Sequence, residues 1–289
     1  MKLLVTGAKG MLAYDILRVA GQAGHELLAI DLPELDITDA EAVQSYFAEH
    51  RPEALINCAA WTDVDGAESH EDAAHAVNAT GPAVLSRAAA AHNAALLHLS
   101  TDYVFPGHPP LDGAGEPRPY VESDATGPLS VYGKTKLEGE QAVLGGSPRN
   151  TVVRSAWLFG VRGRNFVDTM LRLASEREAV QVVDDQIGSP TWTGHLAPAL
   201  VGMLEREVRG LVHLAASGSV SWNGFAKEIF RQAEVECEVQ PASTEQMARP
   251  APRPAFSVLS TERSDVLPMP DWRDGLAGYL AARAGLTRA

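Results

Sequence analysis

Short apolar runs alternate with longer helical segments over the first 155 residues, and this alternation constrains the fold more than any other feature. The runs are Leu3–Val5, Leu27–Ile30, Ala54–Asn57, Leu96–Ser100 and Thr151–Ser155. Each is short enough for a strand, and each is apolar without alternation, as strands buried on both faces should be. Strands separated by helices predict right-handed βαβ units, and therefore a doubly wound, Rossmann-type parallel sheet.

The segments between these runs carry apolar residues at helical spacing. We expect helices around residues 12–19 and 42–47, and a third over the alanine-rich stretch 73–92. Thr38 or Asp39 can cap the second helix, because a short polar side chain before an apolar-periodic segment favours a helix start. Helices of this kind would cover both faces of the sheet.

The pattern becomes less regular after Ser155, which indicates a second, smaller domain. A chain of 289 residues suits a nucleotide-binding domain with a cap. We expect a dinucleotide-binding domain over residues 1–157 and a mainly substrate-binding domain over 158–289, with about 195–214 returning to the first. In this part we expect helices at 166–175, 196–205, 221–234 and 271–283, and strands at 180–183 and 211–214.

The first apolar run ends in Gly7-Ala8-Lys9-Gly10-Met11-Leu12-Ala13, a GxxGxxA pattern. Glycine permits a tight turn and close approach of a pyrophosphate, and the following helix start offers free N–H groups. Asp31 ends the next run, 21 residues after Gly10, where a carboxylate can accept hydrogen bonds from a ribose. The pattern predicts a bound NADH or NADPH; an ordinary structural turn is the alternative.

The choice between the two cofactors stays open. Asp31 would repel a ribose 2′-phosphate and so favours NADH, but Lys9 could offset that repulsion. Asn57-Cys58-Ala59-Ala60 follows the third run, and its small residues would leave room for the cofactor. Ordinary strand-to-loop packing is the alternative there.

Tyr132 and Lys136 are four residues apart, so they share one face of a helix. A tyrosine has a pKa of about 10, and a nearby ammonium lowers it by favouring the phenolate. We therefore predict that Lys136 lowers the pKa of Tyr132 and makes it a better general acid. Thr101 directly follows the fourth run, where it could hydrogen-bond the same substrate carbonyl oxygen as Tyr132. A surface tyrosine beside a solvated lysine is the alternative.

Charge and cysteine usage argue against several other functions. The net charge of −13 disfavours binding to a phosphate backbone, so no nucleic acid is expected. No apolar stretch approaches the roughly 20 residues that span a bilayer, and no His/Cys spacing indicates a metal. The two cysteines form no CxxC pair, which suits the cytosol. Glycine and proline dominate residues 108–128, which predicts an irregular loop.

Together these residues resemble the extended short-chain dehydrogenase/reductase superfamily and, within it, the dTDP-4-dehydrorhamnose reductases. The most specific stretches are Ser100–Gly107 (STDYVFPG) and Val131–Glu140 (VYGKTKLEGE). Further matching stretches are Gly7–Ala13, Asn57–Glu68, Val153–Gly160, Asn165–Ala174, Asp185–Thr191 and Arg253-Pro254. Two features depart from the family pattern: Ala13 replaces a third glycine, and the loop holding His108 to Gly115 is long.

The resemblance implies reduction of the 4-keto group of a dTDP-linked 4-keto-6-deoxy sugar to dTDP-L-rhamnose, with NADPH or NADH. It assigns catalysis to Thr101, Tyr132 and Lys136. We predict cofactor contacts at Gly7, Gly10, Met11, Leu12, Asp31, Asp36, Ile37, Cys58, Ala59, Ala60, Thr62, Tyr132 and Lys136. We predict substrate contacts at Thr101, Asp102, Tyr103, Tyr132 and Trp157; a core position is the alternative for Trp157.

Two other functions stay open. One is a nucleotide-sugar epimerase or dehydratase, although dehydratases of this superfamily usually carry an acidic pair where this chain has Asp102-Tyr103. The other is a non-catalytic regulatory subunit, like that of methionine adenosyltransferase, which would bind the cofactor without turnover. A homodimer is an open expectation, and some relatives carry magnesium at a dimer interface, but no ligand spacing here predicts a metal.

Overall fold

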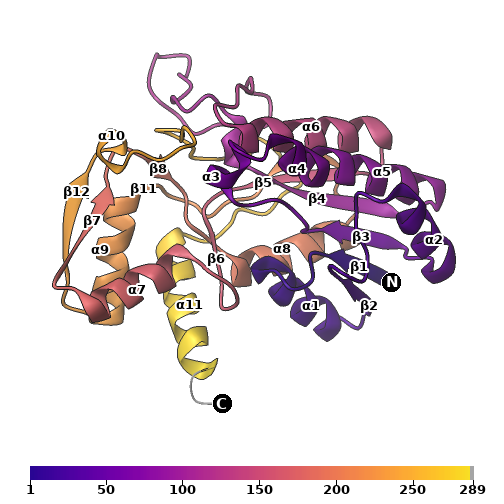
Figure 1. Cartoon of the computed structure of the whole chain (residues 1–289), viewed down its shortest axis with the longest axis horizontal. Helices are drawn as coiled ribbons and strands as arrows, with labels where there is room; N and C mark the ends of the chain where they lie inside the picture. The colour runs from indigo at the N-terminus through magenta and orange to yellow at the C-terminus, as the bar shows by residue number, and fades with distance from the viewer. Residues whose placement is uncertain (287–289) are drawn as a thin grey trace.

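A six-stranded, entirely parallel sheet forms the centre of the molecule in the computed structural model, which describes residues 1–286 (Figure 1). The strand order is β10-β5-β4-β3-β1-β2. The strands are β1 (Lys2–Thr6), β2 (Glu26–Ile30), β3 (Ala54–Asn57), β4 (Ala95–Thr101), β5 (Thr151–Ser155) and β10 (Gly210–His213). The five expected strands are all present, and the doubly wound parallel sheet is confirmed.

Helices cover both faces of this sheet. One layer packs on side chains such as Leu3, Val5 and Ile56, and the opposite layer packs on the intervening Leu4 and Leu55. The first layer contains α1 (Met11–Gln22) and α8 (Thr193–Glu205). The second contains α2 (Ala40–His50), α5 (Gly81–Ala91) and α6 (Val131–Gly146). Figure 1 shows α5 and α6 above the strands, with α1 and α8 on the other side of the sheet. Alternate residues of each strand therefore face different cores, which is why the strands are apolar throughout.

The alanine-rich stretch 73–92 is not one regular helix, contrary to expectation. It consists of α4 (Glu71–His75), a π-helical turn η1 (Ala76–Thr80) and then α5. The π turn places Asn78 inside the protein, where its amide accepts from the N–H of Trp61 and donates to Thr135 Oγ1. A polar side chain drawn inward at this point, and not alanine periodicity, determines the local backbone; such π turns are frequent at functional sites.

Residues beyond β5 build a second apolar core to the left in Figure 1. Its elements are α7 (Phe166–Glu176), β7 (Ala179–Val183), α9 (Trp222–Ala233), β12 (Glu238–Ala242) and α11 (Trp272–Leu286). Trp272 and Tyr279 of α11 are almost fully buried in it. By contrast, α8 packs on α1, and β10 pairs with β5 in the central sheet.

Shorter elements connect these layers. They are α3 (Val64–Ala67), η2 (Asp102–Val104), β6 (Leu158–Phe159), β8 (Ile187–Gly188), β9 (Thr191–Trp192), β11 (Val220–Ser221) and α10 (Thr244–Met247). Within residues 1–286, none of the helices has both the length and the apolar character that a bilayer crossing needs.

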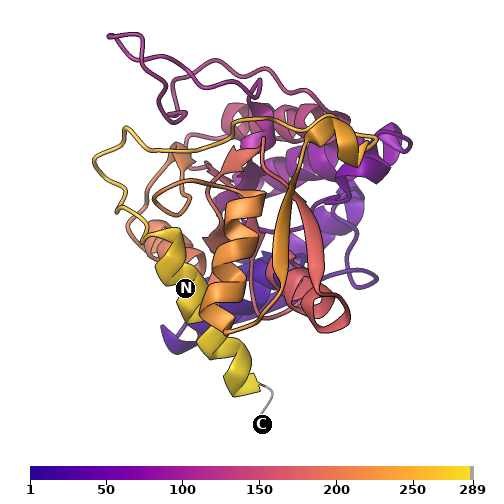
Figure 2. The ribbon, with the colours of Figure 1, turned by 90° about the vertical axis from the view of Figure 1, so that its left-hand side faces the viewer.

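The glycine- and proline-rich segment 108–128 is an irregular loop, as expected. It projects at the top of Figures 1 and 2. Tyr120 anchors it, because this side chain is buried, stacks on Phe105 at a ring distance of 4.0 Å and donates to the carbonyl oxygen of His108. Arg118 and Asp124 form a bidentate ion pair within the loop.

Candidate active site

The candidate site lies where the carboxyl ends of β1, β3 and β4 meet. Because all strands are parallel, Gly7 and Cys58, which directly follow β1 and β3, lie at the same edge of the sheet as Thr101, the last residue of β4. In open α/β sheets this edge is where ligands bind. Helix α6 runs beside β4 and brings Tyr132 and Lys136 toward the same edge.

The glycine turn has the geometry that the sequence predicts. Gly7 adopts a φ of +68°, and its carbonyl oxygen accepts from the N–H of Gly10 at 2.9 Å. Helix α1 then begins at Met11, and its N-cap, Gly10, has no side chain to bond the first N–H groups. Those groups and the positive end of the helix dipole suit a pyrophosphate. The turn therefore fits a dinucleotide cofactor.

Gly7 also closes the turn against the loop after β3. A Cβ atom at this position would lie 2.7 Å from the backbone nitrogen of Ala59. We expect Gly7→Ala to raise the Kd for NADPH or NADH by about tenfold or more, which is ~1.4 kcal/mol, because the turn must open to relieve this contact. Gly24→Ala is the matched control, since Gly24 has a φ of +80° and open space around it. Titration of both variants by cofactor fluorescence checks this, and equal affinities would contradict it.

Asp31 is tied to the glycine turn by backbone hydrogen bonds. One carboxylate oxygen accepts from the N–H of Lys9 at 2.9 Å, and the other accepts from the N–H of Leu32 at 2.8 Å. The Lys9 ammonium reaches the carbonyl oxygen of Leu32 and lies 3.8 Å from Glu34. Asp31 and Lys9 thus stand side by side at the end of β2, one able to bind a ribose and the other a phosphate.

The remaining predicted cofactor residues fall into three groups by exposure. Met11, Cys58, Ala59 and Ala60 are half-buried at the glycine turn or directly after β3. Leu12 and Ile37 are instead buried in the two cores, at 7% and 6% exposure, so only their backbones could face a ligand. Asp36 and Thr62 are exposed, and the Asp36 carboxylate accepts from Thr38.

Tyr132 and Thr101 lie together at the centre of the site. The Tyr132 hydroxyl lies close to the Thr101 side chain, which acts to lower the pKa of the phenol. Thr101 in turn donates to Asp102 Oδ1 at 3.0 Å and accepts from the N–H of Tyr103 at 3.2 Å. The hydroxyl proton of Thr101 is thus directed at Asp102. Ser130 caps α6 by accepting from the N–H of Gly133, which fixes the turn that carries Tyr132.

The expectation that Lys136 lowers the pKa of Tyr132 is wrong for this structure. Burial raises the pKa of Tyr132 to about 12, and it lowers the pKa of Lys136 to about 8. The Lys136 Nζ atom donates to the carbonyl oxygen of Leu99 at 2.6 Å and lies 3.3 Å from His98 Nε2. The ammonium group is thus turned toward β4, and desolvation outweighs any effect on the phenol.

The predicted substrate residues differ in accessibility. Asp102 is 2% exposed, and burial raises the pKa of its carboxyl to about 6, so it lies behind Thr101 and not on an open surface. Tyr103 is half-buried, and its ring packs edge-to-face on that of Tyr132 with the ring centroids 5.5 Å apart. Trp157 is half-buried with a φ of +48°, and it stacks on Trp222 at 3.6 Å. Trp157 therefore combines a packing role with a partly open face.

Sequence reasoning missed a buried ion pair below the site. Glu140 and Arg154 are joined by three hydrogen bonds of 2.7 to 3.1 Å, and Ser100 donates to the same carboxylate at 2.5 Å. Both side chains are nearly inaccessible. One signal could have found it: Glu140 is four residues after Lys136, on the face of α6 that carries the tyrosine and the lysine.

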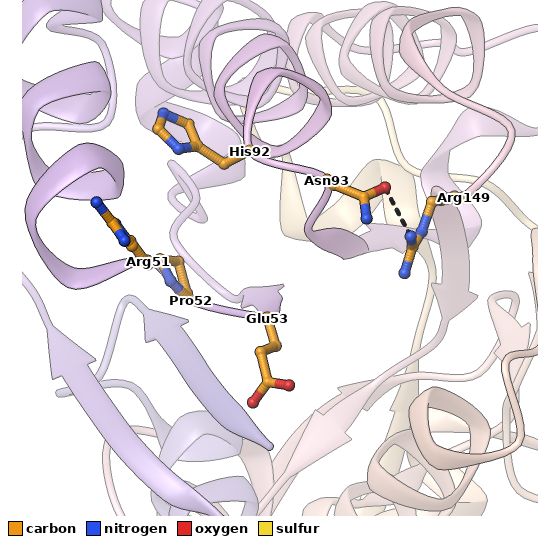
Figure 3. A pocket seen from close by; sticks show the side chains of 6 residues that line it. All are labelled: Arg51, Pro52, Glu53, His92, Asn93 and Arg149. Atoms are coloured by element: carbon orange, nitrogen blue, oxygen red, sulfur yellow. Dashed lines mark hydrogen bonds between the residues drawn. The ribbon is translucent and has the colours of Figure 1, made fainter.

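An open pocket of about 340 Å³ lies at the opposite edge of the sheet, near the starts of β3, β4 and β5 (Figure 3). Its side chains come from loops, and Arg149 donates to Asn93 within it. The pocket is lined by Arg51, Pro52, Glu53, His92, Asn93 and Arg149. It lies away from the carboxyl ends of the strands and holds none of the predicted site residues. Within residues 1–286, no group of three or more His, Cys, Asp or Glu side chains could hold a metal ion.

Comparison with known proteins agrees with this geometry. The family model described as "RmlD substrate binding domain" matches residues 1–284. The chain belongs to this family. Its match covers both the sheet with the glycine turn and the C-terminal elements from α7 to most of α11, so the family includes both parts of the molecule.

Several relatives of this RmlD-family chain have assigned names. A dTDP-4-dehydrorhamnose reductase of Mycobacterium tuberculosis H37Rv is 45% identical over 99% of this chain and 94% of its own. A probable dTDP-4,6-dihydroxy-2-methyloxan-3-one 4-ketoreductase of Streptomyces antibioticus is 42% identical over 96% of this chain and 93% of its own. The crystal structure of dTDP-4-dehydrorhamnose reductase from Bacillus anthracis in complex with NADP is 36% identical, with a TM-score of 0.92 over 98% of this chain and 100% of that one.

Proposed function

We propose that this chain is a dTDP-4-dehydrorhamnose reductase, which reduces the 4-keto group of dTDP-4-dehydro-6-deoxy-L-mannose to dTDP-L-rhamnose with NADPH or NADH. The observation that carries the proposal is the placement of Tyr132, on α6, beside Thr101 at the carboxyl edge of the sheet that also holds the glycine turn at Gly7. The names of the relatives, at 42–45% identity over nearly the whole chain, support the substrate class.

The reduced nicotinamide, when bound, supplies the hydride that adds to the carbonyl carbon. Tyr132 donates its phenolic proton to the alkoxide that forms on the sugar, and Thr101, whose side chain lies beside the phenol, would contact the same oxygen. The raised pKa of Tyr132 keeps the proton on the phenol at neutral pH until the alkoxide forms. Gly7, Gly10 and the start of α1 would hold the pyrophosphate, and Asp31 with Lys9 would contact the adenosine ribose.

We infer that residues 1–157 form the cofactor domain and 158–289 mainly the substrate domain, with about 195–214 belonging to the first. The packing of α8 on α1 and the pairing of β10 with β5 support this division. Residues 287–289 lie outside the described part. A second copy of the chain as a partner, and a location in the cytosol, stay predictions.

The proposal is tested by following the absorbance of reduced cofactor while the purified protein acts on a dTDP-linked 4-keto-6-deoxy sugar. We expect one cofactor consumed per sugar reduced, and much lower kcat/KM with the UDP- and GDP-linked counterparts. A cofactor that is recycled without net consumption would indicate an epimerase or dehydratase. Cofactor binding without turnover of any of these sugars would indicate a regulatory subunit.

A further inference from the structure

A chain of buried polar groups leads from β1 to the candidate catalytic lysine. Thr6 Oγ1 donates to Asn57 Oδ1 at 2.7 Å, and the backbone N–H of Ala59 donates to the same oxygen at 3.1 Å. Asn57 Nδ2 lies 2.9 Å from His98 Nδ1, and His98 Nε2 lies 3.3 Å from Lys136 Nζ. The side chains of this hydrogen-bonded series are each at most 2% exposed; they are Thr6, Asn57, His98 and Lys136. Its hydrogen bonds are therefore shielded from water.

The direction of each hydrogen bond can be deduced from groups that can only donate or only accept. The backbone N–H of Ala59 can only donate, so the Asn57 atom that faces it must be the oxygen. The amide nitrogen of Asn57 then faces His98, donates to it, and requires a lone pair on Nδ1. Burial and the nearby Lys136 hold the pKa of His98 well below its usual range, so the ring is neutral. Its single proton must be on Nε2.

This tautomer presents an N–H group to the lysine. The Lys136 Nζ atom faces one acceptor, the carbonyl oxygen of Leu99, and one donor, His98 Nε2–H. An ammonium group has three donors and no acceptor, whereas a neutral amine has both. The surroundings therefore match a lysine that gives up its proton readily.

The other groups that face Lys136 do not remove this effect. The Cys58 thiol stays neutral, because burial raises its pKa to about 12. Glu140 on α6 favours the ammonium, but its carboxylate is bonded to Arg154 and Ser100. Tyr132, on the same face of α6, stays a neutral phenol until it gives up its proton. Among these neighbours, His98 is the one whose hydrogen position can be switched by a partner.

We propose that His98 is a positioning residue for Lys136: its neutral tautomer, fixed by Asn57, directs Nε2–H at the lysine and so favours the neutral amine of Lys136 over the ammonium. Only the kinetic test of this inference rests on the proposed function, because it measures turnover of the keto sugar. The tautomer itself follows from the contacts of Ala59, Asn57 and His98.

A second buried histidine provides a matched internal control. His213 on β10 is 2% exposed, and its Nδ1 atom lies 2.9 Å from the carbonyl oxygen of Ser260. A carbonyl can only accept, so this histidine carries its proton on Nδ1, and its Nε2 faces the guanidinium of Arg154 at 3.4 Å. The two buried histidines should therefore be opposite tautomers.

Nitrogen-15 NMR of the protein labelled at histidine tests the first half of the proposal. We expect a neutral Nε2–H ring for His98 and a neutral Nδ1–H ring for His213, with His98 assigned by its absence from the spectrum of His98→Phe. In Asn57→Asp, a carboxylate replaces the donor, so the His98 proton should move to Nδ1. A wild-type His98 with its proton on Nδ1, or with both nitrogens protonated, overturns the proposal. No sugar is needed, so this result is independent of the proposed reaction.

The pH dependence of kcat tests the second half. We expect Asn57→Asp to move the basic limb of the kcat–pH profile upward by about one pH unit. The ammonium of Lys136 gains one hydrogen bond in this variant, and the free energy of one hydrogen bond corresponds to a pKa shift of about that size. The added negative charge alone could also raise that limb, so Asn57→Asp is repeated in the His98→Phe background. If the shift caused by Asn57→Asp in the His98→Phe background is less than half of its size in the wild-type background, the proposal is supported. If the shift is equal in the two backgrounds, the proposal is overturned. If the variants fail to fold, the wild-type tautomer still decides the question.

Discussion

Replacing Tyr132 with phenylalanine is expected to lower kcat for the keto sugar by roughly 10²–10⁴-fold, the usual worth of a well-placed general acid. The phenol lies beside Thr101 at the carboxyl edge of the sheet, and its raised pKa keeps it protonated at neutral pH. The ring itself remains in the variant, so its edge contact with Tyr103 should persist. The Kd for NADPH or NADH should change by less than threefold, on the order of 0.6 kcal/mol.

Stopped-flow measurement of hydride transfer separates this loss from effects on binding or release. Tyr46→Phe is the matched control, because Tyr46 is on the distant helix α2, where its ring contacts His50. We expect that control to keep wild-type kcat. A Tyr132→Phe enzyme whose hydride transfer stays close to the wild-type rate would remove Tyr132 from the mechanism, whatever its cofactor affinity.

The sheet and the position of the site could be predicted because both depend on local pattern. Buried parallel strands must be apolar on both faces, so runs such as Ala54–Asn57 and Thr151–Ser155 mark strands directly. Once the strands are parallel, their carboxyl ends share an edge, and this places Gly7 and Thr101 together without knowledge of any contact. Helix α6 carries Tyr132 and Lys136 on one face, as expected for residues four apart on a helix.

The electrostatics of the site could not be predicted, because they depend on burial and on contacts between distant segments. His98 meets Lys136 across 38 positions and Asn57 across 41 positions, and only the register of β3 with β4 aligns them. The spacing of Tyr132 and Lys136 indicated one helix face, but not that both groups are desolvated. The pKa of Tyr132 is therefore raised, not lowered. The π turn at Asn78 was missed for a similar reason, since alanine periodicity does not report a buried amide.

Removing the guanidinium below the site is expected to destabilise the fold more than any surface change. In Arg154→Met, the carboxylate of Glu140 stays in a site where it is 1% exposed, with Ser100 as its remaining donor. Breaking one partner of a buried pair typically costs about 3–5 kcal/mol, because the other charge is left uncompensated. Methionine is chosen because it can keep the contact with the Phe105 ring, over which the guanidinium lies at 5.0 Å.

Two comparisons separate the effect of an unpaired Glu140 carboxylate from a loss of packing. The free energy of unfolding of each variant is measured by urea titration. Arg172→Met breaks an exposed pair with Glu176 on α7 and should cost only about 0–1 kcal/mol. The double variant Arg154→Met/Glu140→Met removes both charges, and it should recover most of the lost stability, because no buried charge is left unpaired. If the double variant is as unstable as Arg154→Met alone, lost packing accounts for the decrease in the free energy of unfolding, and the unpaired carboxylate of Glu140 does not.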